Sequence, residues 1–444
     1  MSYSIKCASE QNRRYHENQR LSDLKPLAHP EQGDKLPVNN KLGWEETMRG
    51  LCQFAASMLV VGNCCSGFAA AAQAQYLIVG NDEKWFFSDG KPTATPPGKD
   101  TVSIIDIRDR AKPRIVVTLP LENSVIGPPT NLAITPDGKL ALIANSIDVV
   151  KDGDNWKNVP DNKLFVIDLT TSPPAVISTI QTGKQPSGMA INHAGNLALV
   201  ANRADNTISV LTISGKSVTL VGTVRLAPVD AASQQASAVA ITPDGKRALV
   251  AKALANKVAL LDIDGTKVTY KGYDMSTGVF PYNVQITADG RLGLINNTGN
   301  GGTPDGQVNT VAVIDMTLDP PRVVDHVVVG YVPEGLAVSP TGSYAVSLMD
   351  NASGGTAPNN AFFRHDHSVA VLLKIEGKKV RKVGETEVGT LAEGIAFSPD
   401  GRFLYVANSM DQDMTVLRLE GNHLAPVGSL KLPGHPGSMR GSTP

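Results

Sequence analysis

The sequence predicts an all-β protein built from repeated four-stranded sheets, and three observations support this. The first is a recurring turn with the pattern T/S-P-D-G-K/R or a close variant, at Thr135–Lys139, Asn192–Asn196, Thr242–Lys246, Thr287–Arg291, Ser339–Ser343 and Ser398–Arg402. The second is that short alternating runs of apolar residues, typical of β-strands, flank every copy. The third is the spacing, because the turn glycines recur every 45 to 59 residues, a period typical of β-propeller blades.

The repeated turn has the composition of a tight hairpin. In the first copy, Pro136 presets φ for the first corner and Asp137 tolerates the second, while Gly138 can adopt the left-handed conformation that closes a bulged hairpin. Each copy is therefore expected to join the first and second strands of one repeat.

Each repeat contains four strands. In the unit around the first turn, the expected strands cover Asn131–Thr135, Leu140–Asn145, Leu164–Leu169 and Ala175–Ile180. The third strand is rich in β-branched residues and ends near an Asp, whereas the fourth is weaker. Six such units follow one another along the chain.

A seventh unit is divided between the two ends of the propeller sequence. Its second, third and fourth strands are expected at Gln75–Asp82, Thr101–Ile107 and Arg114–Leu119. Its first strand is supplied by His435–Ser442, which aligns with the first strands of the other units. The sequence thus predicts a seven-bladed β-propeller with four strands per blade, closed by N- and C-terminal strands in one blade so that no sheet edge stays open.

The repeat resembles a known one. The runs ALVAN and FLYVAN, together with the P-D-G turns, are similar to the YVTN-type repeat of bacterial β-propellers, within the wider seven-bladed lactonase-like superfamily. The resemblance covers Gln75 to Pro444. It implies a propeller fold, and it implies lactone hydrolysis as one function, although propellers also serve as binders and scaffolds. Lactonase-like propellers typically carry an Arg-His pair at the entrance to an inner strand, where this chain reads PYN, PEG and AEG.

The segment before the propeller has a different character. Residues 48–74 combine an early Arg49, an apolar stretch and an A-x-A pattern at Ala72 and Ala74, which together indicate a secretory signal cut after Ala74. Residues 1–47 are polar and are expected to be a disordered extension, or a segment upstream of a true start at Met48. The expected location is the periplasm or the medium, with no stable membrane insertion after cleavage.

Cysteine and charge content narrow the chemistry. All four cysteines precede Gln75, so the mature chain has no disulfide and no covalent haem attachment. From Gln75 onward there are 33 basic and 35 acidic residues, an almost neutral balance that predicts no nucleic-acid partner. We expect a monomer.

The first strands are expected to bring side chains to the mouth of the central channel, on the face opposite the P-D-G turns. The residues at this position are Asn131, Ser187, Ser237, Tyr282, Glu334, Glu393 and the neighbourhood of His435. Glu334 and Glu393 occupy equivalent places in adjacent blades, so their carboxylates should meet. If the protein is an enzyme, Glu334, Glu393 and His435 are the candidate catalytic residues. The alternative is that both carboxylates cap backbone amides.

The ends of the second strands follow a different pattern. Five blades carry Asn there, and the other two carry Lys252 and Met349. In blade order the residues are Asn81, Asn145, Asn202, Lys252, Asn297, Met349 and Asn408. The repeated Asn is interpreted as structural, bonding local backbone in the next turn. Lys252 and Arg203 could bind a ligand or steady an oxyanion, or they could be solvated or paired charges.

Long connections between second and third strands occur in blades 1, 2, 5 and 6 and are expected to carry function. Trp85 and Trp156 are candidate ligand-binding aromatics, or anchors of their own loops. His365 and His367 alternate in the blade 6 loop and could bind ligand directly or, with Glu334 or Glu393, hold a divalent metal. No cofactor is otherwise indicated, since the chain has no nucleophile elbow, phosphate loop or zinc signature.

These observations favour an exported propeller that binds a small molecule or a partner protein on its loop-rich face. The alternative is a lactonase-like hydrolase with its site at the channel mouth, and a further alternative is a non-catalytic scaffold. Convergence of acidic groups at the mouth separates the first two from the third, because a scaffold does not need it.

The export hypothesis predicts a mature N-terminus at or near Gln75, because the A-x-A pattern is followed at once by the first expected strand. N-terminal sequencing of protein recovered from a periplasmic extract checks this. A chain that keeps Met1 or Met48 and stays with the membrane fraction contradicts it.

Overall fold

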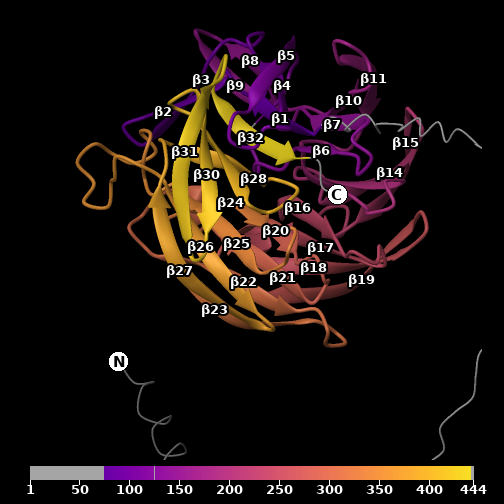
Figure 1. Ribbon diagram of the computed structural model, residues 1–444. Helices are drawn as coiled ribbons and strands as arrows, with labels where there is room; N and C mark the ends of the chain where they lie inside the picture. Colours follow the sequence, from indigo (N-terminus) through magenta and orange to yellow (C-terminus); the bar gives the residue numbers. More distant parts are fainter. Residues whose placement is uncertain (1–74, 125, 442–444) are drawn as a thin grey trace, which may run out of the picture. The chain divides into compact units, whose positions relative to one another are not determined.

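The computed structural model describes residues 75–124 and 126–441, so the expected extension 1–47 and signal segment 48–74 lie outside the described residues. Within those ranges, seven four-stranded antiparallel sheets are arranged around a common axis (Figure 1). The predicted all-β, seven-bladed architecture is confirmed. In every blade the strand nearest the axis is also the first of the repeat.

The strands of the first four blades run from the axis outward. Blades 1 and 2 contain β32 (Pro436–Gly441), β1 (Tyr76–Asn81), β4 (Thr101–Asp106) and β5 (Arg114–Pro120), then β6 (Leu132–Ile134), β7 (Leu140–Ala144), β10 (Lys163–Asp168) and β11 (Ala175–Gln181). Blades 3 and 4 contain β12 (Pro186–Ile191), β13 (Leu197–Asn202), β14 (Thr207–Ser214) and β15 (Ser217–Arg225), then β16 (Ala236–Ile241), β17 (Arg247–Lys252), β18 (Lys257–Asp264) and β19 (Lys267–Ser276).

The remaining three blades repeat the same order. Blade 5 contains β20 (Pro281–Ile286), β21 (Leu292–Asn297), β22 (Asn309–Asp315) and β23 (Arg322–Gly330). Blades 6 and 7 contain β24 (Pro333–Val338), β25 (Tyr344–Met349), β26 (Val369–Glu376) and β27 (Lys379–Glu387), then β28 (Ala392–Phe397), β29 (Phe403–Asn408), β30 (Asp413–Glu420) and β31 (His423–Lys431). Two single-turn 3₁₀ helices, η1 (Ala253–Ala255) and η2 (Asn300–Gly302), lie in the connections that follow β17 and β21.

The ring closes as the sequence predicts, with β32 pairing antiparallel to β1. Met439 of β32 is fully buried and packs in one cluster with Leu77 of blade 1 and Tyr405 of blade 7. The chain end therefore supplies both the missing inner strand of blade 1 and part of the apolar contact between blades 7 and 1.

The P-D-G turns have the expected geometry. Gly138 has φ 68° and donates its amide to the Thr135 carbonyl over 2.8 Å. The Asp137 carboxylate accepts from the Thr135 hydroxyl at 2.7 Å and from the Lys139 amide at 3.1 Å. The side chains thus reinforce a turn that the backbone alone would close.

The Asn residues at the ends of second strands are structural, but their partners differ from those expected. Asn202 donates to the hydroxyls of Thr207 and Ser209, at 2.9 and 3.0 Å, on the neighbouring third strand. Asn81 makes the equivalent bonds to Thr101 and Ser103. The amide side chain thus ties the second strand to the start of the third inside the blade.

Charged pairs link neighbouring blades on the P-D-G side. Lys216 of blade 3 reaches the Asp168 carboxylate of blade 2 at 2.5 Å, and Lys378 of blade 6 reaches Asp315 of blade 5 at 2.6 Å. The hydrogen bond from Lys216, with a further one from Thr170, lowers the pKa of Asp168 to about 2. The Asp that ends a third strand therefore has a defined role between blades.

Two of the connections expected to be loops are two-stranded sheets, which corrects the prediction. They are formed by β2 (Trp85–Ser88) with β3 (Lys91–Ala94), and by β8 (Ile147–Asp152) with β9 (Asn155–Pro160). The tip of the β2–β3 hairpin reaches the loop of blade 6, where Gly90 donates its amide to the Gly355 carbonyl at 2.8 Å. Figure 1 shows β2 and the long connection after β25 on the same side of the ring.

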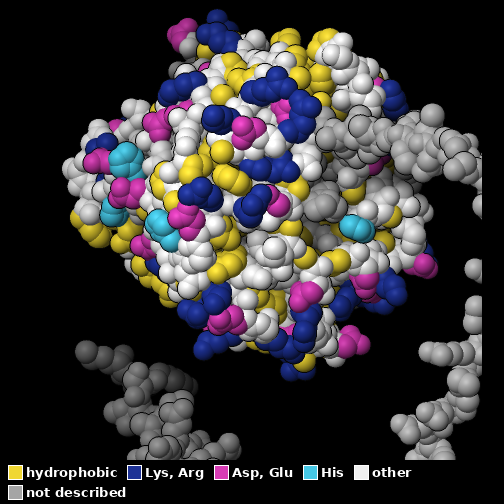
Figure 2. All heavy atoms as spheres, in the orientation of Figure 1, with side chains coloured by type: hydrophobic (Ala, Val, Ile, Leu, Met, Phe, Trp, Pro, Cys, Tyr) yellow, Lys and Arg dark blue, Asp and Glu magenta, His cyan; other side chains and the backbone are white. Residues whose placement is uncertain are grey.

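The surface is mixed in charge. Figure 2 shows basic and acidic side chains interspersed over the face in view, as the nearly equal totals of 41 basic and 42 acidic residues imply. A search of the described residues found no helix whose length and hydropathy would let it cross a membrane.

Removal of the chain from His435 onward should lower the free energy of unfolding by several kcal/mol, out of about 5–15 kcal/mol typical of folded proteins, or cause aggregation. The reason is that the truncation exposes the edge of β1 and removes Met439 from an apolar cluster. Chemical unfolding of both chains measures the effect. A chain that ends at Gly441 keeps β32 and is the control; equal stability of all three chains would show that the termini do not share a blade.

Candidate functional site

The inner strands place one residue each at the loop-rich mouth of the channel. Each of the inner strands β12, β16, β20, β24 and β28 has an irregular register at its start, between its first and fourth residues. With the strands aligned on this register, the residues that share the position are Thr130, Ser187, Ser237, Tyr282, Glu334, Glu393 and Gly437. This corrects the sequence alignment at blades 2 and 1, where Asn131 and the neighbourhood of His435 were expected.

Glu334 and Glu393 lie close enough for the charge of one to act on the other. Burial, and then the charge of Glu334, raises the pKa of Glu393 well above its usual range. Burial raises the pKa of Glu334 to about 8, and the nearby charge of Asp350 adds to the rise. The two carboxyl groups therefore cannot both be ionised at neutral pH without a cation between them.

Asp350 is a third member of this carboxyl group cluster and was not identified from the sequence. It follows β25 directly, is only 2% exposed, and accepts hydrogen bonds from Thr356 at 2.9 Å and Ser353 at 3.4 Å. Burial raises its pKa to about 7 in spite of these bonds. The sequence does contain a signal for it. In blade 6, Met349 stands where five other blades end the second strand with Asn, and the acidic Asp350 follows directly.

A cation and a phenol face the carboxyl groups from other blades. The guanidinium carbon of Arg203 lies 5.9 Å from the ring centroid of Tyr282, and its Nη2 donates to the side-chain oxygen of Gln235 at 2.7 Å. Burial raises the pKa of Tyr282, and the charges of Glu334 and Glu393 raise it further while Arg203 opposes them. These mutual effects place side chains from blades 3, 5, 6 and 7 around one point.

Two glycine-containing connections approach the same point. The Gly127 amide donates to the Tyr282 hydroxyl, and a Cβ added at Gly127 would lie 2.1 Å from the Ser187 hydroxyl oxygen. A Cβ added at Gly302, in the connection after β21, would lie 3.9 Å from Glu334 Oε1. Only glycine allows the backbone at this position to lie so near Ser187.

His435 has other partners, and no hydrogen bond or ion pair of the described residues joins it to Glu334, Glu393 or Asp350. Its Nδ1 is 2.9 Å from both carboxylate oxygens of Glu83, and its ring meets Phe86 edge-on with centroids 4.7 Å apart. Gln412 contacts the other ring nitrogen at 3.0 Å. These contacts join blade 1 to blade 7, so the structure gives His435 a positioning role at the closure of the ring.

His365 and His367 are exposed and do not join Glu334 or Glu393. The ring of His365 stacks on Tyr331 with centroids 5.8 Å apart, and the His367 carbonyl accepts from Asn351. In residues 75–124 and 126–441, no group of three or more His, Cys, Asp or Glu side chains is arranged to hold a metal. The structure thus does not bring these histidines to Glu334 or Glu393, and direct ligand binding by them stays a prediction.

Lys252 and Arg203 do not act together. Lys252 is buried and donates to Asp274 at 2.9 Å, beside Tyr270, in a separate cavity of about 500 Å³ between blades 3 and 4. Its charge is compensated there, which corresponds to the paired alternative from the sequence. Arg203 alone reaches the channel mouth.

The two candidate aromatic residues sit on the extra hairpins. Trp85 on β2 and Trp156 on β9 are both half-buried, and the hairpins approach each other through β3 and β9. The indole nitrogen of Trp85 is buried and bonds no described residue. Both side chains are held by sheet structure and belong to the cover of the loop-rich face.

The raised carboxyl pKa values predict a pH-dependent stability. A carboxyl group with a higher pKa in the folded than in the unfolded chain stabilises most at low pH, and this stability is lost as pH rises through the folded value. For the Asp350 pKa the window runs from the ordinary value of 3.8 to about 7. The variant D350N should therefore gain stability relative to the parent between pH 4 and pH 8, by at most about 4 kcal/mol.

Urea unfolding of the parent and D350N at several pH values measures this difference. The control is D366N, which alters an exposed carboxylate of the same blade 6 loop and should follow the parent at every pH. A constant difference between D350N and the parent would show that Asp350 titrates in its ordinary range.

Comparison with known proteins places the fold. No protein-family model matches the chain, and no curated protein matches it either. Solved structures do. A protein classed provisionally as a 6-phosphogluconolactonase from Bacteroides fragilis has a TM-score of 0.61 at 15% identity, with 84% of this chain and 99% of that chain covered.

Two further structures agree with this result. The periplasmic gluconolactonase of Pseudomonas aeruginosa has a TM-score of 0.57 at 18% identity, with 83% of this chain and 98% of that chain covered. A functionally unknown protein from Desulfotomaculum acetoxidans has a TM-score of 0.60 at 16% identity, with 84% and 100% covered. At these identities the likeness concerns architecture alone. The chain therefore shares its propeller fold with these solved structures.

Proposed function

We propose that this protein is an exported propeller that binds a small, polar, uncharged or weakly charged molecule at the loop-rich mouth of its central channel. The observation that carries the proposal is the convergence of Glu334, Glu393 and Asp350 with Arg203 and Tyr282. Carboxyl groups that hold protons near neutral pH both donate and accept hydrogen bonds, as recognition of hydroxyl and carbonyl groups requires. A scaffold would gain nothing from burying these groups.

The chemistry of the cluster favours a ligand with several oxygens. A protonated Glu393 donates one hydrogen bond, an ionised Asp350 or Glu334 accepts others, and Arg203 offers fixed donors to a carbonyl or a partial negative charge. Sugar-derived alcohols and cyclic esters match this set. A multiply charged anion does not match it, because the ionised forms of Asp350 and Glu334 would repel such a ligand.

Lactone hydrolysis is the second candidate function, and one observation favours it. The pKa of Glu334 is raised to about 8, near the pH at which an enzyme would work, and the pKa of Glu393 is also raised well above its usual range. One carboxylate can thus accept a proton while its neighbour donates one. The similarity to solved gluconolactonase structures supports this candidate at the level of fold.

The reaction would proceed in balanced steps. The ionised carboxylate of Glu334 takes a proton from water as the water oxygen bonds to the lactone carbonyl carbon, and Arg203 stabilises the oxyanion that forms. The bond from this carbon to the ring oxygen then breaks, and the carboxylic acid of Glu393 gives its proton to the departing oxygen. The product is a hydroxy acid, and a proton passed from Glu334 to Glu393 restores the pair.

Export completes the proposal. The signal-like segment 48–74 supports it, and so does the periplasmic location named for one solved structure of the same fold. A periplasmic site would meet sugar-derived molecules and lactones that enter from outside the cell.

The double variant E334Q/E393Q tests the site. It removes the shared proton while it keeps side-chain size, so it should weaken binding of aldonolactones or related polyols by about tenfold or more, a loss of about 1.4 kcal/mol. If the protein is a hydrolase, the variant should also abolish lactone opening. Calorimetry with a panel of lactones, polyols and their acids measures binding. Turnover is measured by the amount of base needed to hold the pH constant while the lactone opens to its acid.

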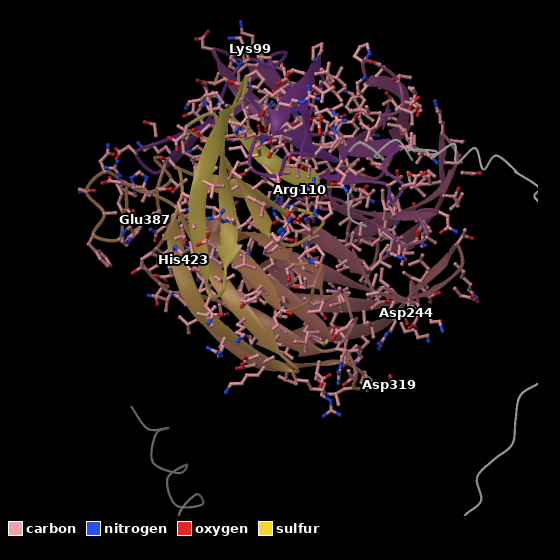
Figure 3. All side chains as sticks on the ribbon, in the orientation of Figure 1. Lys99, Arg110, Asp244, Asp319, Glu387 and His423 are labelled. Carbon is pink, nitrogen blue, oxygen red and sulfur yellow. The ribbon has the colours of Figure 1, made fainter. Side chains whose placement is uncertain are left out.

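The matched control is E387Q, which changes an exposed carboxylate at the end of β27, labelled in Figure 3. It should bind and react like the parent. Ligand binding that survives in E334Q/E393Q with unchanged affinity would contradict the proposed site. If the double variant loses binding and the parent shows no turnover of any lactone, the binding function is supported and the hydrolase is excluded.

A further inference from the structure

The opposite end of the central channel has a different chemistry. A cavity of about 260 Å³ lies there, lined by the second halves of inner strands β6, β12, β16, β20 and β32. Strands from five blades border one space only around the axis, so this cavity belongs to the channel and not to a gap between two blades. It opens on the side of the P-D-G turns, such as the one that carries Asp244 in Figure 3.

The inner-strand register explains why the space exists. Three residues after the position of the carboxyl groups, five blades place alanine, at Ala133, Ala190, Ala240, Ala337 and Ala396. The same position holds Gln285 in blade 5 and Arg440 in blade 1. Three of these small side chains, Ala133, Ala190 and Ala240, line the cavity together with Arg440 and Gln285, which come from nearly opposite blades of the ring.

Arg440 has no anionic partner within the described part of the chain. No ion pair or hydrogen bond of its guanidinium joins it to residues 75–124 or 126–441, and burial is the only influence on its pKa, which is lowered to about 10. It stays charged at neutral pH. A half-buried guanidinium in an apolar channel is costly unless an anion compensates it.

We infer that this cavity is a second ligand site, which binds a small organic carboxylate through Arg440 and Gln285. A guanidinium forms two parallel hydrogen bonds with a carboxylate, and the Gln285 amide can donate a third from across the cavity. Ala190, Ile191 and Ile241 among the other lining residues are apolar, so the remainder of the ligand should be a short hydrocarbon chain.

The charge arrangement agrees with an anion at this end. Arg440 is the charged side chain among the residues that line this cavity, so an anion is attracted here. The inference stands apart from the proposed function, because it uses none of the same side chains.

Calorimetric titration of the full mature chain with acetate, butanoate and hexanoate tests the inference. Affinity should rise by about fourfold for each added methylene until the cavity is full. Butanamide, which has the same shape without the charge, and sulfate, which has charge without the chain, should bind at least about tenfold more weakly than butanoate. No saturable binding of butanoate, or equal binding of sulfate, overturns the inference.

Variants locate the site. R440Q should weaken butanoate binding by about tenfold or more, R440K by less, since a lysine keeps the charge but not the paired bonds, and Q285A by about threefold. The control is R291Q, which changes an exposed arginine on the same face and should bind like the parent. Thermal unfolding shows whether R440Q is folded; if it is not, R440K and Q285A decide, and unchanged affinity in both overturns the assignment.

A chain that ends at Gly441 distinguishes an external ligand from the protein's own C-terminal carboxylate. Equal butanoate affinity in this chain and the parent supports a ligand site. Binding that appears only after the last three residues are removed overturns it, because the chain end then competes for Arg440.

Discussion

The close approach of the seven inner strands to the axis is the constraint on which the rest of this structure depends. In blades 3 and 6 glycine makes it possible: a Cβ added at Gly335 would lie 2.3 Å from the carbonyl oxygen of Glu393, and one at Gly188 would lie 2.6 Å from Ala238 Cα. A side chain at either position would push neighbouring blades apart. Because the inner strands lie so near the axis, the residue that precedes each of these glycines lies at a crowded, poorly hydrated channel mouth.

The chemistry of both channel ends follows from this crowding. At one mouth, Glu334 and Glu393 meet with Asp350 where water is scarce, so burial keeps protons on groups that would lose them in solution. At the other, alanines in three blades and the larger apolar side chains around them leave Arg440 beside an apolar space. The blades supply stability through their apolar contacts and cross-blade ion pairs, and the axis is free to hold groups that cost stability.

Much of the fold could be predicted from local patterns in the sequence. The P-D-G turns, the strand alternation and the match of His435–Ser442 to an inner strand were sufficient for seven blades and for closure, because each depends on short-range geometry. The adjacent Glu334 and Glu393 could be paired for the same reason, since equivalent positions in neighbouring blades must lie side by side.

Other features depend on contacts that no local pattern encodes. Asn131 was assigned to the channel mouth, but the strand register places Thr130 there, one residue away. His435 was expected near the carboxylates, yet Glu83, from the connection after β1, holds it elsewhere. Asp350 belongs to the site because of contacts within its own loop, such as the hydrogen bond from Thr356. Lys252 does not belong to it, because its ammonium group pairs with Asp274 on another strand of blade 4.

The central claim is that crowding at the channel mouth keeps protons on carboxyl groups at neutral pH. Carbon-13 NMR of protein labelled at the glutamate side-chain carboxyl, with E334Q and E393Q used to assign the signals, measures each titration directly. We expect the signals of Glu334 and Glu393 to shift only above pH 6, with coupled curves. Two independent titrations completed below pH 5 would contradict it.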